Sequence, residues 1–299
     1  MIKVTVIIPT YGMPIFLEST INSVLSQTLK DFELIIVDDN NPNTEPRLQT
    51  EKLMNEICQF DSRVKYIKHD RNMNGAVARN TGFSLAKGKY IALLDSDDAY
   101  MPDRLQKCYD TMESSIEKFA GVYTGCEFRR KGKSYNKFKK VKTGNFLVET
   151  LACTFMFCSG SNVFVRKKVV DELGGFDPSF QRQQDYEFLV RLFEKYSLIA
   201  IPEILLVKNQ ENFNLPNIDK QIAIRKQYLN KFQKIIENLD ECNRNYIFHS
   251  QSVSLAEGAM RNKNYKIANL YYAKAKKYGR LTTEEWIRRL MFPIFTLFH

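Results

Sequence analysis

The chain has 299 residues, of which 44% are hydrophobic and 26% are charged. Such a chain is long enough for one large α/β domain with an appendage, and no apolar run reaches the roughly 18 residues that a membrane-spanning helix requires. The net charge of +10 is unevenly placed: eight basic residues and no acid lie between Arg129 and Lys142, and 15 basic against 7 acidic residues follow from Leu215 onward. We therefore expect an anionic partner for the basic parts, such as a membrane surface, a lipid diphosphate or nucleic acid; a solvated lysine-rich surface is the alternative.

Strand-like and helix-like segments alternate through the first 95 residues. Short apolar runs indicate strands, and apolar residues at helical spacing indicate amphipathic helices. In chain order the expected elements are a strand at 4–8, a helix at 17–25, a strand at 33–37, a helix ending near 60, a strand at 64–67, a helix from 75 and a strand at 90–94. This βαβαβ order with short connections predicts an α/β fold with a doubly wound, mostly parallel sheet.

The alternation loosens after residue 98, and the C-terminal third is almost wholly helical in pattern. The expected elements are a helix at 105–119, a strand at 121–123, a loop or exposed hairpin through 142, a strand at 161–165, helices at 167–173 and 185–195, and a helical hairpin at 245–261 and 265–278. We therefore predict two domains: an α/β domain at residues 1–214 and a basic helical region at 215–299 with an amphipathic tail.

The N-terminus and the cysteines indicate a cellular compartment. Residues 1–9 have the pattern of a strand and lack the small-residue cleavage site of a signal peptide. The six cysteines show no CxxC spacing, and they are Cys58, Cys108, Cys126, Cys153, Cys158 and Cys242. This pattern argues against a zinc site and a disulfide framework, and it favours reduced thiols in the cytoplasm.

Two groups of acidic residues follow apolar strands. Asp38-Asp39-Asn40 follows one strand, and Asp95-Ser96-Asp97-Asp98 follows another. In an open α/β sheet, ligands bind outside the carboxyl ends of the strands, so we expect these acids to converge on one crevice. Hard oxygen ligands favour Mg²⁺ or Mn²⁺, often together with substrate phosphates. The alternative is that the acids are ordinary turn formers.

Seven short motifs follow one another in a fixed order through residues 1–210. They are VIIPTY (6–11), SVLSQT (23–28), FELIIVDD (32–39), GAVARNTG (75–82), GKYIALLDSDD (88–98), GGFD (174–177) and QDYE (184–187). In order and spacing they resemble family 2 glycosyltransferases of the GT-A fold, particularly bacterial enzymes that build surface polysaccharides. The resemblance implies a Rossmann-like domain that binds a nucleotide sugar.

The resemblance also implies roles for residues of the donor site. Asp39 matches the acid that recognises the nucleotide, by contact with the uracil edge of a UDP-sugar. Pro9, Thr10 and Tyr11 are then expected beside the base. Arg79 matches a basic residue that contacts phosphate or positions the acids, with a purely structural ion pair as the alternative.

Asp95-Ser96-Asp97 matches the DXD motif of the family. The resemblance implies that Asp97 is the main ligand of Mn²⁺ or Mg²⁺ and that Asp95 lies near the ribose or a metal-bound water. Many relatives place a further histidine ligand where this chain has Val207-Lys208-Asn209-Gln210. No histidine of this chain fits that place, so we assign no histidine ligand.

Asp185 matches the general base of the family, which removes the proton of the acceptor hydroxyl. The alternative role is that of a helix N-cap, and the two roles are compatible. The family usually has Glu-Asp where this chain has Gln184-Asp185. We expect this departure to leave the base intact and to remove one acceptor contact beside it.

The C-terminal tail, residues 286–299, combines aromatic, aliphatic and basic side chains. Trp286 is followed by a largely apolar run that contains Arg288 and Arg289. This pattern predicts an interfacial membrane anchor; packing on the domain or on another subunit is the alternative. Nucleic acid is disfavoured as a partner because no nucleic-acid-binding motif is present.

Together these observations predict an inverting, metal-dependent hexosyl- or N-acetylhexosaminyltransferase. The donor is expected to be a UDP-sugar, and the acceptor a glycan or polyprenyl-diphosphate-linked oligosaccharide in cell-surface polysaccharide synthesis, at the cytosolic face of the membrane. One rival is a haloacid dehalogenase-type phosphatase, whose nucleophile motif resembles a strand ending in Asp-Ser-Asp, but here the motif lies on a late strand. The other rival is a catalytically inactive adaptor, disfavoured because Asp39, Asp97 and Asp185 are all present.

Overall fold

The computed structural model describes residues 1–210 and 216–295, with side chains described only through residue 289 in the last helix. The chain divides into two compact units, Met1–Asn145 with Phe157–Asn212, and Phe146–Met156 with Phe213–His299. The segment 146–156 therefore belongs to the second unit, although it lies within the predicted first domain. The boundary predicted between residues 214 and 215 falls outside the described residues and stays a prediction.

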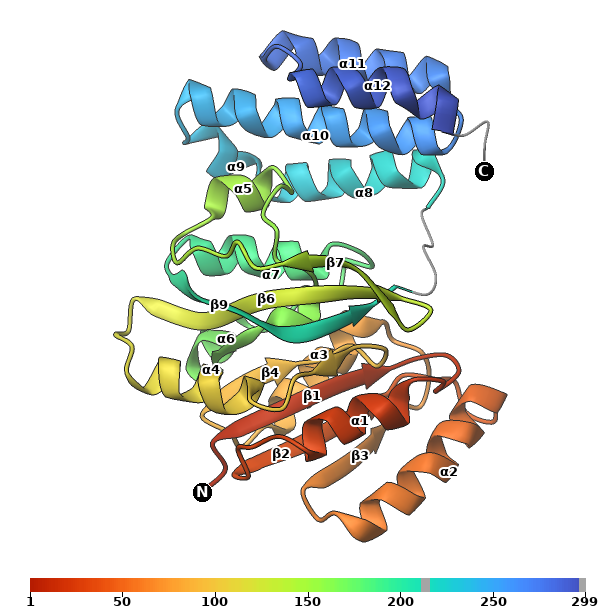
Figure 1. Cartoon of the computed structure of the whole chain (residues 1–299), viewed down its shortest axis with the longest axis vertical. Coiled ribbons are helices and arrows are strands. Elements are labelled where there is room, and N and C mark those ends of the chain that lie inside the picture. The colour runs from red at the N-terminus through yellow and green to blue at the C-terminus, as the bar shows by residue number, and fades with distance from the viewer. Residues whose placement is uncertain (211–215, 296–299) are drawn as a thin grey trace. The chain divides into compact units, whose positions relative to one another are not determined.

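The N-terminal half of the first unit forms the parallel part of a single sheet (Figure 1). Its strands, in spatial order, are β3 (Val64–Lys68), β2 (Phe32–Asp38), β1 (Val4–Thr10) and β4 (Tyr90–Leu93). β1 is central, and its Ile7 is opposite Ile35 of β2 and Leu93 of β4. The predicted βαβαβ order is confirmed.

The sheet continues beyond β4 with mixed strand directions. The further strands, in spatial order, are β8 (Phe164–Arg166), β6 (Phe119–Arg130), β9 (Ser197–Asn209) and β5 (Ala99–Tyr100), with β7 (Lys133–Phe138) paired to β6. β8 is antiparallel to both β4 and β6, whereas β6 and β9 are parallel. The sheet is thus parallel from β3 to β4 and mixed from there on.

Helices complete the first unit. They are α1 (Leu17–Leu25), α2 (Glu45–Phe60), α3 (Gly75–Leu85), α4 (Arg104–Glu113), α6 (Lys167–Leu173) and α7 (Gln184–Phe193), with a short 3₁₀ turn η1 (Gly160–Asn162). α3 begins sharply because the Asn74 side chain accepts hydrogen bonds from the backbone N–H groups of Ala76 and Val77, which satisfies two of the free donors of a helix start. This cap fixes the helix that carries Arg79.

Two expectations for the middle of the chain need correction, and one long strand was missed. The helix predicted at 105–119 ends at Glu113, and the chain enters β6 at Phe119. The strand predicted at 161–165 begins as the turn η1 and pairs only from Phe164. β9 was not predicted, although its 13 residues make it the longest of the described strands. The basic stretch is confirmed as an exposed hairpin, formed by β6 and β7.

The second unit is helical, as predicted. Its helices are α5 (Leu147–Leu151), α8 (Ile218–Lys231), α9 (Gln233–Glu237), α10 (Glu241–Arg261), α11 (Tyr265–Tyr278) and α12 (Thr283–Phe295). α10 and α11 form the expected hairpin and meet through buried alanines, which permit close helix approach: Ala256, Ala259, Ala268 and Ala275. Within the described residues, none of the helices is both long and apolar enough to cross a membrane.

Candidate functional site

The two acidic segments meet at one cavity of about 350 Å³ beyond the carboxyl ends of β1, β2 and β4, which we call the first cavity. Its lining residues are Pro9, Thr10, Tyr11, Asp39, Asn72, Asn74, Gly75, Ala78, Arg79, Asp95 and Ser96. The structure thus brings together all the residues that the sequence assigns to the donor site. The convergence follows from the parallel pairing of β1 with β2 and β4, which ends these strands at the same edge.

A second cavity, of about 480 Å³, adjoins the first and shares two of its residues. Its lining residues are Arg79, Asp95, Ser159, Gly160, Phe176, Gln181, Arg182, Gln183, Gln184, Asp185 and Tyr186. Asp185, the predicted base, therefore lies in a cavity next to the predicted donor residues. Asp97 lines neither cavity but follows Ser96 directly.

An ion pair between Arg79 and Asp95 forms the boundary of the two cavities. Arg79 Nη2 lies 2.7 Å from Asp95 Oδ1, and Nη1 donates to the backbone oxygen of Gly75 at 3.2 Å and to Gln184 Oε1 at 2.9 Å. A Cβ atom on Gly75 would lie only 3.0 Å from Nη1. The guanidinium thus lies against Gly75 at the start of α3, between Asp95 and the segment that carries Asp185.

Gln184 retains a contact that the sequence predicted to be lost. Its amide oxygen accepts from Arg79, and its amide nitrogen donates to the backbone oxygen of Phe180 at 2.7 Å. The difference from Glu at this position is therefore one negative charge, and the acceptor itself is present.

Both carboxylate oxygens of Asp39 accept hydrogen bonds. Its two oxygens accept from the His69 ring at 2.8 Å, the Asn72 amide at 2.9 Å and the backbone N–H groups of Met73 and Asn74 at 2.8 and 2.9 Å. An ionised carboxylate has about four lone-pair sites, so these bonds fill them. Asp39 therefore holds the 72–74 segment that lines the first cavity, and direct contact with a uracil edge requires that it give up one of these bonds. His69 was not assigned from the sequence.

Its neighbour Asp38 lies outside the site. Asp38 is fully buried and pairs with Arg47 at 3.1 Å, and it also accepts from Tyr66 Oη at 2.5 Å. The two adjacent acids alternate in direction, as expected at a strand end, so only Asp39 reaches the cavity.

The acids after β4 surround Lys208, which the sequence left without a role. Lys208 Nζ lies 3.0 Å from Asp98 Oδ2 and 3.5 Å from Asp95 Oδ2. Asp98 also accepts from Ser161 Oγ at 2.6 Å and from the backbone N–H of Asn209 at 3.1 Å. Both Asp98 oxygens are thus occupied. Lys208 is brought here by β9, whose pairing with β5 places Val207 opposite Ala99.

Burial and charge act against each other on these carboxyl groups. Burial raises the pKa of Asp98 to about 7, against the opposing charge of Lys208. Burial would also raise the pKa of Asp95, but the charges of Lys208 and Arg79 outweigh it and keep that pKa below its usual value. The acids in turn hold the pKa of Lys208 above its usual value although burial opposes this. Asp95 and Lys208 are therefore charged at neutral pH.

The three acids after β4 lie close enough together to form a site for a hard cation. Asp95, Asp97 and Asp98 each offer an oxygen within 4.8 Å of the others. Asp98 is fully occupied by Ser161, Lys208 and Asn209, whereas Asp97 is exposed. The donor set therefore fits Mg²⁺ or Mn²⁺ held by Asp97 together with Asp95, with further ligand positions open to other oxygens.

Asp185 is the second residue of α7, two positions past the N-cap. Gln183 is the N-cap residue, in the left-handed region with φ of 59°, so the N-cap alternative for Asp185 is wrong. Asp185 Oδ1 accepts from the backbone N–H of Tyr186 at 3.0 Å. Burial raises the pKa of Asp185, and the charge of Asp95 adds to the rise while Arg79 and the hydrogen bond from Tyr186 oppose it. A carboxylate with a raised pKa is a stronger proton acceptor.

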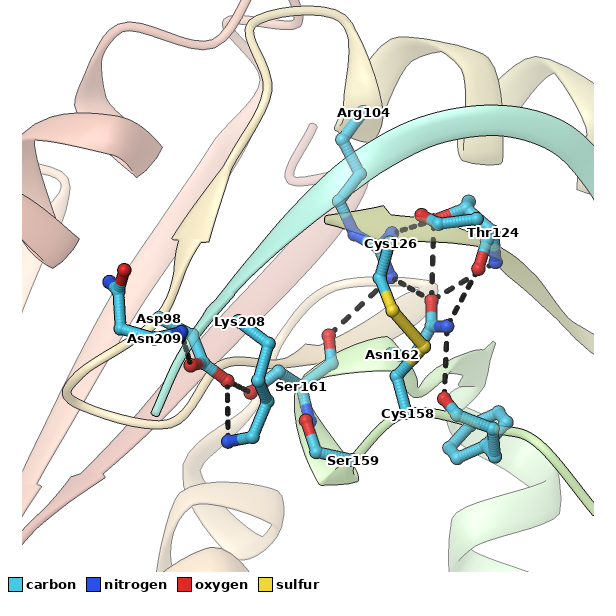
Figure 2. Close-up of a disulfide and its surroundings, with 12 residues drawn as sticks. Asp98, Arg104, Thr124, Cys126, Cys158, Ser159, Ser161, Asn162, Lys208 and Asn209 are labelled. Atoms are coloured by element: carbon cyan, nitrogen blue, oxygen red, sulfur yellow. Dashed lines mark hydrogen bonds and ion pairs between the residues drawn. A yellow bond between two sulfur atoms is a disulfide. The ribbon is translucent and has the colours of Figure 1, made fainter. Parts of the chain in front are cut away.

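A disulfide between Cys126 and Cys158 corrects the expectation that all the cysteines are reduced thiols. The two residues are 32 positions apart and meet only because β6 runs beside the segment that leads into η1. Figure 2 shows the disulfide beside Asn162, with Ser161 lying toward Asp98 and Lys208. Asn162 exchanges hydrogen bonds with the backbone of Thr124 at 2.8 and 3.0 Å. The segment that bears Ser159, Gly160 and Ser161 is thus attached to β6.

The comparisons with known proteins agree on one family. Residues 5–174 match the model of glycosyl transferase family 2, and residues 90–262 match glycosyl transferase family group 2. An uncharacterized glycosyltransferase of Methanocaldococcus jannaschii is 34% identical over 76% of this chain and 76% of its own length. A GalNAc(5)-diNAcBac-PP-undecaprenol beta-1,3-glucosyltransferase of Campylobacter jejuni is 23% identical over 93% of this chain and 85% of its own length.

Two solved structures are similar over almost the whole chain. S. aureus TarS, in a complex with UDP-GlcNAc, gives a TM-score of 0.58 at 13% identity and covers 94% of this chain and 93% of that one. A mannosyltransferase of Pyrobaculum calidifontis, in a complex with GDP-Man and Mn²⁺, gives 0.58 at 17% identity and covers 99% and 80%. At these identities the likeness shows the fold, and the GT-A fold expected from the sequence is confirmed.

Proposed function

The chain belongs to glycosyl transferase family 2, and from this membership we propose that it transfers a sugar from a UDP-sugar to a glycan or lipid-linked acceptor with inversion at the anomeric carbon. The observation that carries the proposal is the shared Asp95–Arg79 pair, which joins a cavity lined by the nucleotide-site motifs to a cavity lined by Asp185. A transferase needs its donor and its base on either side of one reacting carbon, and two adjoining cavities that share this pair support such an arrangement.

The first cavity is proposed to hold the nucleotide, with Pro9, Thr10 and Tyr11 beside the base. Asp39 orders the 72–74 segment that forms the opposite wall. The solved structures of similar fold hold UDP-GlcNAc and GDP-Man, so this fold accommodates uridine and guanosine diphosphate sugars. We propose a UDP-hexose or UDP-N-acetylhexosamine for this chain.

Asp185 is proposed as the general base. The acceptor hydroxyl oxygen bonds to the anomeric carbon and gives its proton to the Asp185 carboxylate, while the bond from that carbon to the β-phosphate oxygen breaks and releases UDP. Attack opposite the leaving group inverts the configuration. The raised pKa of Asp185 supports this role because the group accepts a proton more readily than an exposed aspartate.

Asp97 and Asp95 are proposed to hold Mn²⁺ or Mg²⁺. When bound, such an ion neutralises the charge that develops on the departing diphosphate. Arg79 orients Asp95 through their 2.7 Å contact. Asp98 lies behind the site, where its bonds to Ser161 and Asn209 hold the loop in place.

Lys208 is proposed to give the diphosphate end of the site a permanent positive charge. It lies at the place where many relatives have a histidine ligand, and its ammonium is 3.5 Å from Asp95. Three carboxylates there face two fixed cations, Arg79 and Lys208. A divalent ion then turns the net charge of the group positive, which favours a diphosphate.

The acceptor is proposed to be an oligosaccharide on a polyprenyl diphosphate, in surface-polysaccharide synthesis at the cytosolic face of the membrane. Support comes from the Campylobacter jejuni relative, whose name specifies an undecaprenol-linked acceptor. The basic character of the second unit is consistent with such an anionic partner.

The proposed membrane anchor is narrowed to residues 290–299. In the first half of α12, Trp286 lies between Lys276 and Arg289, and Arg288 pairs with Glu257 at 2.9 Å. These contacts support packing within the helical unit for this half. The side chains from Leu290 on lie outside the described residues, and their apolar sequence supports the anchor proposal.

Isothermal titration of the full chain with UDP, with and without Mn²⁺, tests the function. A transferase should bind UDP more tightly when Mn²⁺ is present. A phosphatase of the haloacid dehalogenase type or an inactive adaptor should show no such dependence, and that result would overturn the proposal.

The Asp97→Ala variant should lose transfer and the enhancement of UDP binding by Mn²⁺ while unfolding cooperatively at the wild-type temperature. Metal-assisted charge stabilisation contributes several kcal/mol, so activity should fall below about one tenth of wild type. Asp110→Ala, which removes an exposed acid on α4, is the matched control. Greater retained activity removes Asp97 from the ligand role.

The Asp185→Asn variant should lower kcat by roughly 10²–10⁴ because it keeps the shape of the side chain but accepts no proton. UDP affinity should be nearly unchanged. In the wild-type enzyme, the acid limb of the pH profile should lie above the range of an ordinary aspartate, since the raised pKa keeps Asp185 protonated to higher pH. A collapse of donor binding would instead mark Asp185 as a donor-site residue.

The Lys208→Met variant should weaken UDP binding in EDTA by about tenfold, or about 1.4 kcal/mol, because it removes a positive charge from the diphosphate end. Lys208→Arg should keep most of the affinity. Lys107→Met, which removes a lysine paired with Glu203 on the surface, controls for net charge. Equal affinities of wild type and Lys208→Met in EDTA would contradict the role.

Deletion of residues 290–299 should weaken binding to anionic vesicles. The salt dependence of the remaining binding should be unchanged, because the deleted segment carries no lysine, arginine or acid. Donor hydrolysis and the melting temperature should be retained, since Trp286 and Arg288 keep their contacts. Vesicle flotation measures the first effect. Unchanged flotation together with aggregation or a new oligomeric state would show that the segment is a packing element.

A further inference from the structure

The helical unit contains a cavity of about 420 Å³ between α8, α10 and α11, which we call the helical-unit cavity. Its residues are absent from the motifs that assign the transferase site, and all of them lie within the second unit. Four features of its walls are informative: the sign of the charges, the absence of ion pairs for those charges among the described residues, two buried polar atoms without hydrogen bonds, and aromatic rings.

The charged residues of the wall are all cationic. They are Arg225 and Lys226 of α8 and Lys274 and Lys277 of α11, and none of the described Asp or Glu residues lines the cavity. In the described part of the chain, none of the four forms an ion pair. Cations gathered around one hollow repel one another, and that repulsion is relieved by an anion.

Two wall residues have a buried polar atom that no protein group satisfies. Arg225 Nη2 donates to Ser254 Oγ at 3.2 Å, but Nη1 is buried without a hydrogen-bond partner. Gln251 is 2% exposed; its amide nitrogen donates to the backbone oxygen of Leu151, but Oε1 has no partner. Buried polar groups are nearly always satisfied. Both atoms have almost no accessible surface, so a ligand in the cavity reaches them only after a side-chain rotation.

Aromatic rings form part of the apolar wall, together with Ile222, Leu229 and Leu255. Phe248 and Tyr278 have ring centroids 5.2 Å apart, and Tyr271 lies under the Lys274 ammonium at 4.6 Å. A surface of lysines alone would be an ordinary solvated face. Cations combined with aromatic rings suit a ligand that has both an anionic group and a ring that packs on aromatic side chains.

We propose that the helical-unit cavity binds a sugar phosphate, with the phosphate at the four cations and the sugar ring against the aromatic side chains of the wall. The free sugar phosphate and the phosphate-linked sugar of a polyprenyl diphosphate share this chemistry. The proposal rests on the proposed function in one respect, since an anionic acceptor is what such a transferase would retain. The cavity and its proposed ligand concern the helical unit alone.

The test titrates the full chain with N-acetylglucosamine 1-phosphate after its donor site has been saturated with UDP and Mg²⁺. Lys274→Glu should weaken this binding at least tenfold. Lys266→Glu, an equal charge change at an exposed position of the same helix outside the cavity, should not. Both positions are at the surface, so the fold is retained. Inorganic pyrophosphate and unphosphorylated N-acetylglucosamine, each titrated alone, should bind more weakly than the sugar phosphate.

The outcomes separate the cavity from the transferase site. Absence of binding to the UDP-saturated chain, or equal losses in Lys274→Glu and Lys266→Glu, would overturn the cavity proposal while leaving the function intact. Absence of UDP binding in the first step would instead contradict the proposed function. A short-chain polyprenyl diphosphate sugar in detergent, compared with the free sugar phosphate, identifies the source of the ligand by its relative affinity.

Discussion

The ion pair between Arg79 and Asp95 is the interaction on which the site depends. Asp95 follows a buried strand, and its charge is maintained there because Arg79 and Lys208 outweigh the effect of burial on its pKa. Arg79 reaches it from α3, whose start is fixed by Asn74 and whose first residue, Gly75, leaves room for the guanidinium. The same guanidinium contacts Gln184, next to the proposed base. A substitution of Arg79 or Asp95 should therefore alter both cavities.

The mixed part of the sheet positions Lys208 and Ser161 beside the acids that follow β4. β9 brings Lys208 to the acids after β4, and the disulfide attaches the segment that contains Ser161 to β6. Ser161 and Lys208 then hold Asp98 from two directions (Figure 2). Unpaired, a buried carboxylate would be costly and would protonate. Asp98 thus stabilises the loop, while its exposed neighbour Asp97 remains available to a cation.

The sequence was sufficient where local pattern determines the structure. Apolar runs ending in acids identified β2 and β4, and parallel pairing made the meeting of Asp39 and Asp95 predictable. It was insufficient where distant segments decide the outcome. Lys208 reaches the acids through the register of β9, Cys126 and Cys158 meet across 32 residues, and the segment 146–156 joins the helical unit. None of these leaves a periodic or spacing signal, because each depends on tertiary contacts.

The most direct measurement of the central claim is proton NMR of the sugar released when UDP-, GDP- and dTDP-linked α-hexoses are hydrolysed slowly without acceptor. In this reaction water takes the place of the acceptor hydroxyl, and the proposed base Asp185 would take its proton. The account predicts that a UDP-sugar is the preferred donor and that the β-anomer appears first, before mutarotation. First appearance of the α-anomer would contradict single-displacement inversion with Asp185 as the base, and hydrolysis of none of the donors would contradict the assignment of the two cavities.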